Sequence, residues 1–341
     1  NKNPFSVSKK DLLFFGHPRR KRRWDDKWGD IYSDPLIETL DNDLVYYEEP
    51  YLGKHFTPAK NKNIKYMDLL NIIAHLKGIN NDLSLSKEDK RLINEIHGEI
   101  SERFMVELNL LENVKNAILE RNRYLSLYTR ILQKAKPDLV LLTVSYGKEN
   151  FIEACKHLQI PTVELQHGII HKYHPGYSFP FQGFKKHFPD YLFTFGDYWK
   201  KSIDFPIEKE NIFSVGFPYL ESEKKRFSDQ KTKNQIIFIS QGTIKKELSH
   251  FAIKLSRLDL ELDLVYKLHP GEFENWRKNY SKIANNKIRL VKDEIPLYKL
   301  FSESRMQVGV YSTAIYEGLN FGLETYLLDA PGIEIMDTLI E

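Results

Sequence analysis

Short segments that are apolar throughout alternate with helix-like segments along most of the chain. Two such segments, at 11–15 and 44–47, flank helix-favouring residues near 35–40, which predicts a βαβ opening. After an interval the alternation resumes, with further strand-like segments at 137–143, 161–165, 191–195 and 211–215. A strand that is apolar throughout is buried on both faces, as in a parallel sheet covered by helices. The pattern therefore predicts an α/β domain in the first half of the chain.

In the interval between these strands, from about 64 to 136, the apolar residues have a different spacing. They recur three or four positions apart, as at Leu92, Ile96, Ile100 and Phe104. This spacing is typical of amphipathic helices. We expect a helical insertion here, without strands, inside the N-terminal domain.

The second half of the chain repeats the strand and helix alternation. A polar segment at 221–234 lacks apolar periodicity and is expected to separate two domains, at 1–221 and 234–341. Beyond it, strands are predicted at 235–240, 262–268, 287–291, 306–310 and 324–328, with helices between them. Five strands joined by four crossovers predict a second doubly wound, Rossmann-like domain.

Composition narrows the class of protein. The chain has 341 residues, of which 41% are hydrophobic, and its 50 Lys and Arg against 47 Asp and Glu give a formal charge of +3. This length allows two domains with their own cores, and the hydrophobic content excludes a disordered chain. A nearly neutral chain gives poor support for nucleic-acid binding, so no nucleic-acid partner is expected. The basic run at 19–23 keeps a nucleic-acid binder as the leading alternative that is not an enzyme.

The cysteine content and the hydropathy pattern bear on location. A single cysteine, Cys155, cannot close an intrachain disulfide, which favours a reducing compartment. No apolar run approaches the roughly 18 residues of a membrane span, and the start of the chain has no signal-peptide core. We expect a cytoplasmic protein, and the basic run leaves open a peripheral contact with acidic lipids at the inner face of the plasma membrane.

The residues that follow each predicted strand are the candidate site, because ligands of open α/β sheets bind beyond the carboxyl ends of the strands. In the first half, Gln166, His167 and Gly168 follow the strand at 161–165 and open a loop that contains His174. Histidine is populated in its neutral form near pH 7, so His167 suits a general base. A loop histidine that only bonds the backbone is the alternative.

Three strand ends in the second half carry groups that suit a phosphate. The turn at 241–243 offers backbone N–H groups before a helix. At 267–270 a proline holds the preceding histidine in an extended conformation, beside a lysine. The hydroxyls at 312–313 either cap a helix, which is worth roughly 1 kcal/mol, or bind phosphate oxygens at its N-terminus. The candidate donor-binding residues are Gln241, Gly242, Thr243, Lys267, His269, Pro270, Ser312, Thr313 and, within reach of a ribose, Glu317.

The loop after the first strand mixes cations, carboxylates and aromatic residues from Gly16 to about residue 34. That composition suits an anionic, ring-bearing glycan, and a solvated basic run explains it equally well. His17 and Asp25 are reserve candidates for the catalytic base. The candidate acceptor-binding residues are His17, Arg19, Arg20, Gln166 and His174.

Three short motifs, in this order, resemble those of bacterial GT-B glycosyltransferases of capsule and lipopolysaccharide synthesis: Gln166-His167-Gly168, His269-Pro270 and Ser312-Thr313. The similarity is to sialyltransferase-like and Kdo-transferase-like proteins, and to the glycerophosphotransferases of wall polymers, and it covers roughly 137–329. It implies two Rossmann-like domains that face each other across a cleft. It also implies that His-Pro and Ser-Thr contact the phosphate of a nucleotide donor. The acidic motif that supplies the base in sialyltransferases is missing, and Gln166-His167-Gly168 occupies a comparable place.

The resemblance implies a metal-independent glycosyltransferase. Its donor would be a nucleotide sugar, with a CMP-linked acidic sugar such as Kdo or sialic acid favoured, and its acceptor a surface glycan or a lipid-linked glycan. We expect no cofactor and no metal, since the nucleotide sugar is a substrate. The alternatives are a glycerophosphate or other polyol-phosphate transferase, a nucleotide-sugar epimerase, and the nucleic-acid binder.

Overall fold

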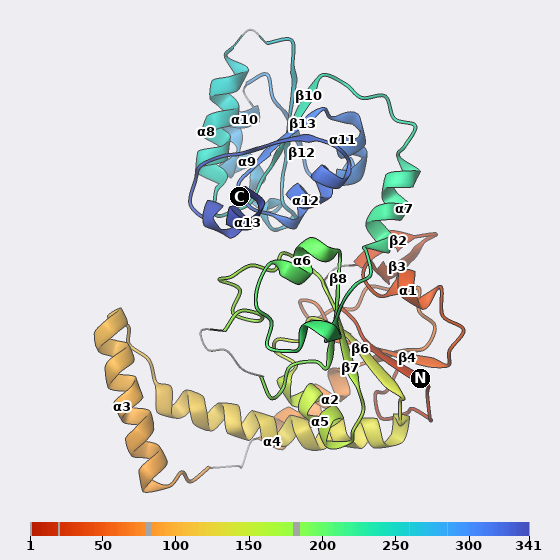
Figure 1. The fold of residues 1–341 in the computed structure, drawn as a ribbon, viewed down its shortest axis with the longest axis vertical. Helices are drawn as coiled ribbons and strands as arrows, with labels where there is room; N and C mark the ends of the chain where they lie inside the picture. Colours follow the sequence, from red (N-terminus) through yellow and green to blue (C-terminus); the bar gives the residue numbers. More distant parts are fainter. Residues whose placement is uncertain are drawn as a thin grey trace. The chain divides into compact units, whose positions relative to one another are not determined.

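The computed structural model describes residues 2–19, 21–78, 83–179, 185–258, 260–284 and 286–340, which form two compact units (Figure 1). The N-terminal unit consists of Asn1–His167, Phe181–Gly196 and Pro206–Val215. The C-terminal unit consists of Gly168–Pro180, Asp197–Phe205 and Gly216–Glu341. The polar segment at 221–234 lies within the last part of the C-terminal unit.

The N-terminal unit is built on a seven-stranded parallel sheet with the order β5-β4-β1-β6-β7-β8-β9. From β1 the chain adds β4 and β5 on one side, and then returns to add β6 to β9 on the other side. The strand order therefore reverses between β1 and β6, which is where ligands bind in sheets of this kind. The strands are β1 (Leu12–Phe15), β4 (Leu44–Glu48), β5 (Ile64–Tyr66), β6 (Leu139–Thr143), β7 (Thr162–Leu165), β8 (Tyr191–Thr194) and β9 (Ile212–Ser214).

Long helices fill much of the interval at 64–136, but the prediction of a helical insertion is not confirmed. The strand β5 lies inside this interval and pairs with β4; its three residues are too short a run to give a strand pattern. Helix α2 (Asp68–Leu76) and the second half of α4 (Leu110–Ala135) pack into the core of the sheet, together with α5 (Glu149–His157). In contrast, α3 (Lys87–Phe104) has no buried residue and stands apart from the sheet of its unit (Figure 1).

The C-terminal unit is built on a five-stranded parallel sheet with the order β12-β11-β10-β13-β14, as predicted. Here the strand order reverses between β10 and β13. Its strands are β10 (Gln235–Ile239), β11 (Asp263–Lys267), β12 (Arg289–Val291), β13 (Met306–Gly309) and β14 (Glu324–Leu327). Its crossover helices include α8 (Lys245–Ser256), α11 (Leu297–Glu303) and α12 (Thr313–Asn320). Buried apolar side chains from the strands and from α8 form its core.

Two segments differ from the sequence prediction. Helix α7 (Pro218–Arg226) runs into the segment that was expected to be a linker, and it buries Tyr219 and Leu220. Both residues precede 221, so the polar segment alone gives no helical signal. The basic run is also not a simple loop, because β2 (Lys21–Trp24) and β3 (Lys27–Asp30) form an antiparallel hairpin.

The remaining helices are short. They are α1 (Asp34–Ile37), α6 (Asp197–Lys201), α9 (Trp276–Asn279), α10 (Ser281–Ala284), α13 (Asp337–Ile340) and the 3₁₀ helices η1 (Lys209–Asn211), η2 (Pro270–Glu272) and η3 (Ile333–Met336).

Candidate functional site

Two histidines lie at the carboxyl edge of the N-terminal sheet, close to the reversal in strand order. His17 follows β1 and His167 follows β7, and the centroids of their rings are 5.9 Å apart. Tyr146, which follows β6, places its hydroxyl oxygen 2.9 Å from Nε2 of His167. The fold therefore brings together two residues that the strand-end rule selects, His17 and His167, which we call the histidine pair.

The local backbone fixes the orientation of His17. The N–H of His17 donates to Oδ2 of Asp30 at 2.7 Å, and its Nδ1 accepts from the N–H of Arg19 at 3.1 Å. Because Nδ1 is an acceptor, the neutral ring carries its proton on Nε2. Gly16 is required just before it, since a Cβ at that position would overlap the hydroxyl of Tyr46.

His167 is held through its main chain. The hydroxyl of Tyr32 donates to the carbonyl oxygen of His167. The preceding side chain, Gln166, is buried, and its Oε1 accepts from the N–H of Phe195 at 2.7 Å. This bond ties the end of β7 to the end of β8, so the structure gives Gln166 a role in positioning the histidine loop.

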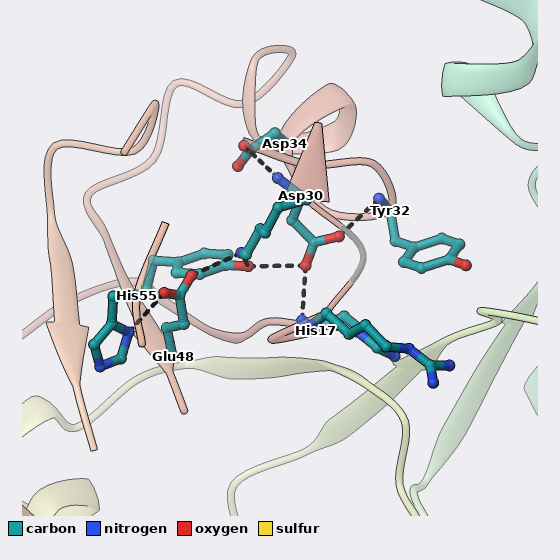
Figure 2. A network of polar contacts seen from close by, with 9 residues as sticks. His17, Asp30, Tyr32, Asp34, Glu48 and His55 are labelled. Carbon is teal, nitrogen blue, oxygen red and sulfur yellow. Dashed lines mark hydrogen bonds and ion pairs between the residues drawn. The ribbon is translucent and has the colours of Figure 1, made fainter. Parts of the chain in front are cut away.

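A buried network of charged and polar groups lies beside His17 (Figure 2). Nζ of Lys21 lies 2.8 Å from Oε2 of Glu48 and 2.9 Å from the hydroxyl of Tyr46. The other carboxylate oxygen of Glu48 lies 2.9 Å from Nδ1 of His55. The hydroxyl of Tyr46 donates to Asp30 at 2.8 Å. Lys21 is therefore an internal counter-ion, which weakens the interpretation of the basic run as a nucleic-acid surface.

Asp34 is the carboxyl of this region whose pKa is most clearly perturbed. Burial, and secondly the charge of Asp30, raise its pKa to about 6, although the N–H of Asp30 donates to it at 2.9 Å. Lys21 and Lys60 oppose the shift. Asp34 therefore exchanges its proton within the mildly acidic range.

In the C-terminal unit, two strand ends meet at the reversal in strand order. The turn after β10 and the turn after β13 are joined by a hydrogen bond of 2.7 Å between the hydroxyls of Thr243 and Tyr311. Helices α8 and α12 begin directly beyond these turns, so two helix N-termini lie at this edge of the sheet. Their backbone N–H groups and dipoles favour an anion. The structure thus brings together the predicted residues at 241–243 and 312–313.

Only one of the two hydroxyls at the start of α12 caps the helix. Oγ of Ser312 accepts from the N–H of Ala314 at 3.2 Å and so caps the helix. Thr313 follows at the first helical position, and a Cβ on Gly168 would lie 3.8 Å from its hydroxyl oxygen. Glu317 lies in the second turn of the same helix, where it is half-buried. Thr313 is thus the hydroxyl of the pair that the helix cap does not use.

His269 has a defined tautomer and conformation at the end of β11. Its backbone is extended, with φ −69° and ψ 143°, and Pro270 begins η2 directly after it, as the sequence predicts. Nδ1 of His269 accepts from the N–H of Gly271 at 3.1 Å, so the neutral ring carries its proton on Nε2. The ring is exposed. Lys267, at the end of the strand, holds its Nζ 5.7 Å from the ring centroid of Phe273.

The carboxylate of Glu272 holds the turn that carries His269. Its Oε2 accepts from the N–H of His269 at 2.9 Å, and its Oε1 accepts from the hydroxyl of Tyr280. The Tyr280 hydroxyl also lies 3.2 Å from that of Ser240, which follows β10. Burial, and secondly the bond to Glu272, hold the pKa of Tyr280 well above its usual value, so the hydroxyl remains a donor. This buried chain fixes the end of β11 relative to the end of β10.

The remaining predicted residues of the first half are His174, Asp25, Arg19 and Arg20. His174 belongs to the C-terminal unit, where burial, and secondly the charge of His171, lower its pKa to about 4. Asp25 lies exposed at the tip of the β2–β3 hairpin, at a positive φ of 44°. Arg19 is exposed two residues after His17, and Arg20 lies outside the described residues.

The sequence predicts neither a metal site nor a membrane span. Within the part of the chain that the structure describes, no group of three or more His, Cys, Asp or Glu could hold a metal ion. An Asp-x-Asp triplet, Asp41-Asn42-Asp43, precedes β4 at the amino edge of the sheet, and Asp43 pairs there with Lys10 at 2.8 Å. None of the helices within the described ranges combines the length and the hydropathy that a membrane crossing requires.

Several residues of the site were not among the sequence candidates. Tyr146 and Tyr311 each follow a predicted strand, so the strand-end rule could have found them. Asp30, Tyr32 and Glu272 act through bonds to main-chain groups of other residues, which no sequence pattern reveals.

Comparison with known proteins supports the architecture. No protein-family model and no curated protein matches the sequence. Among solved structures, the chain is similar to UDP-GlcNAc 2-epimerase from Methanocaldococcus jannaschii in complex with UDP-GlcNAc and UDP, with a TM-score of 0.53, 12% identity, and coverage of 96% of this chain and 86% of that chain. It is also similar to S. aureus MnaA with UDP, with a TM-score of 0.51, 13% identity, and coverage of 95% and 80%. At this identity the likeness shows the fold alone: two Rossmann-like domains of the GT-B type, as predicted.

Proposed function

We propose that this chain is an enzyme that uses a nucleotide sugar and binds the nucleotide through its phosphate at the carboxyl edge of the C-terminal sheet. The observation that carries the proposal is the pair of helix N-termini, α8 and α12, beside the reversal in strand order between β10 and β13. The names of similar structures add support, because two of them hold UDP or UDP-GlcNAc.

Four of the predicted donor-binding residues have a chemical part in this proposal. Backbone N–H groups of the turn that contains Gly242 would bind phosphate oxygens, and the hydroxyl of Thr313 would add a donor. The Nε2–H of His269 would donate to the same group, and such a bond to a charged partner contributes about 1.5–3 kcal/mol. Glu317 would accept from a ribose hydroxyl. These groups would stabilise the negative charge that the departing nucleotide gains.

We further propose transfer of the sugar to a hydroxyl of a surface glycan or a lipid-linked glycan. His167 would accept the proton of the acceptor hydroxyl, whose oxygen forms a bond to the anomeric carbon as the bond from that carbon to the phosphate oxygen breaks. General-base assistance of this kind contributes about 10²–10⁴-fold. The motif resemblance favours a CMP-linked acidic sugar as donor, and the UDP-bound structures make UDP sugars the first competitor.

Epimerisation of the donor sugar is the second candidate. It is favoured by one observation: the similar structure from Methanocaldococcus jannaschii is named as a UDP-GlcNAc 2-epimerase and holds UDP-GlcNAc and UDP. An epimerase acts on the donor alone, whereas a transferase needs an acceptor.

Supplying nucleotide sugars with and without an acceptor tests the two reactions. NMR of the products should show a transferred sugar and free nucleotide only when an oligosaccharide acceptor is present. An isomerised sugar in the absence of acceptor would replace transfer by epimerisation. Absence of any turnover or binding with CMP-, UDP- and GDP-sugars would contradict the proposal.

A further inference from the structure

We propose that Asp30 is the positioning residue of the histidine pair and holds both His17 and His167 in place through their main chains. The inference rests on the proposed function only in naming His167 as the general base. The geometry itself concerns bonds within the N-terminal unit, so it can be tested without any substrate.

The first link runs from Asp30 to His17. Oδ2 of Asp30 accepts from the N–H of His17 at 2.7 Å and from the hydroxyl of Tyr46 at 2.8 Å (Figure 2). Asp30 is fully buried, with 0% of its surface exposed. A carboxylate in this environment stays in place only if its oxygens are bonded, and the first of those bonds fixes the turn that carries His17.

The second link runs from Asp30 to His167 by way of Tyr32. Oδ1 of Asp30 accepts from the N–H of Tyr32 at 2.9 Å, and the hydroxyl of Tyr32 donates to the carbonyl oxygen of His167. Figure 2 shows the ring of Tyr32 extending away from Asp30. The two oxygens of one carboxylate therefore anchor the two histidines separately.

The surrounding network of contacts holds this carboxylate in place. The Tyr46 hydroxyl that donates to Asp30 lies 2.9 Å from Nζ of Lys21. The same Nζ forms an ion pair with Oε2 of Glu48 at 2.8 Å. Glu48 in turn contacts His55, which stacks on Tyr66 with centroids 3.6 Å apart. These contacts connect Asp30 to β4 and β5 of the sheet.

An amide cannot replace the carboxylate at position 30. Three donors converge on Asp30, and they occupy both of its oxygens. Asparagine has one acceptor oxygen and one NH₂ group, so it would face the N–H of either His17 or Tyr32 with a donor. The variant Asp30→Asn should therefore release one of the two histidine links while keeping the size of the side chain.

The first test is spectroscopic and uses the full chain without ligand. In Tyr32→Phe the imidazole NMR signals of His167 should shift, and in Asp30→Asn the signals of at least one of His17 and His167 should shift. The matched control is Asp34→Asn, which changes a neighbouring buried carboxyl that bonds the N–H of Asp30 and neither histidine. The inference would be overturned if, in folded proteins as judged by circular dichroism, Asp30→Asn left the signals of both histidines unchanged or Tyr32→Phe left those of His167 unchanged.

The second test uses turnover. Asp30→Asn should lower kcat by about 10²-fold, the cost of displacing a catalytic group by about 1 Å, with the nucleotide Kd unchanged. Tyr32→Phe should lower kcat less than Asp30→Asn, because it removes only the bond to His167 and leaves the carboxylate of Asp30 in place. A loss in Asp34→Asn equal to that in Asp30→Asn would indicate a purely structural role. If the wild-type protein turns over no nucleotide sugar, the proposed function fails while the spectroscopic test still decides the position of Asp30.

Discussion

In the proposed function, single residues at the strand ends of the two units have different roles, namely nucleotide binding and proton transfer. His269 presents Nε2–H from a turn fixed by Glu272 and Pro270, which suits binding, whereas His167 lies beside His17 and Tyr146, which suits proton transfer. His269→Ala should weaken nucleotide binding by roughly 10–100-fold, since it removes a bond to a charged group.

The matched change at the other histidine should affect a different quantity. His167→Ala should lower kcat by about 10²–10⁴-fold and leave the nucleotide Kd nearly unchanged. Calorimetry gives the Kd and a product assay gives kcat for both variants. Equal losses of nucleotide affinity in the two variants would contradict the separation of roles.

Asp34 makes stability depend on pH in a direction that can be measured. Its pKa is raised from 3.8 to about 6, mainly by burial. Between these values the folded protein binds more protons than the unfolded chain, so this group makes the free energy of unfolding fall as pH rises from about 4 to 6.

The variant Asp34→Asn removes the cost of the buried charge. Urea unfolding at pH 8 should show Asp34→Asn to be more stable than the wild type, with a ceiling of about 3 kcal/mol set by the size of the shift, and the difference should vanish near pH 4. A difference that is the same at both values of pH would show that the charge of Asp34 is not the cause.

The sequence reveals some site residues and hides others for a physical reason. His167, His269 and Ser312 follow apolar strands, so the rule that ligands bind beyond strand ends selects them as candidates. Asp30 and Glu272 act by accepting bonds from N–H groups elsewhere in the chain. Which carboxylate accepts which N–H is decided by the tertiary fold, and their sequence neighbours carry no sign of it.

At the scale of elements, the start of α12 combines helix capping with the proposed phosphate contact. Ser312 caps the helix through the N–H of Ala314, whereas Thr313 makes no cap bond. Ser312→Ala should lower the free energy of unfolding by about 1 kcal/mol. Thr313→Val should leave stability nearly unchanged and weaken nucleotide binding, as measured by urea unfolding and calorimetry. Loss of stability in Thr313→Val, with unchanged nucleotide affinity, would contradict the assignment.

The elements that sequence patterns missed are short or begin outside the expected segment. The strand β5 has three residues, and the hairpin β2–β3 has two strands of four residues each. The hairpin turn at Asp25 and Asp26 has positive φ at both residues, which matches a tight two-residue connection. Its strands alternate only weakly, with Lys21 buried in an ion pair and Arg22 exposed. Because its buried residue is a lysine, β2 has the composition of a basic loop.

At the scale of the whole molecule, the alternation of strands and helices was enough to predict two Rossmann-like domains. Parallel sheets are buried on both faces, so their strands stand out as apolar runs. The solved structures of similar fold share only 12% and 13% of their residues with this chain. The architecture therefore depends on the pattern of apolar positions and not on a shared sequence.

The central claim is that the C-terminal unit holds the phosphate of a nucleotide with protein groups alone. Calorimetric titration of the full chain with CMP, CDP, UDP and GDP, in buffer containing EDTA, tests it most directly. The account predicts that one of these nucleotides binds without a divalent cation and that His269→Ala weakens this binding by about 10-fold or more. Absence of binding by all four, or binding that appears only when a divalent cation is added, would contradict it.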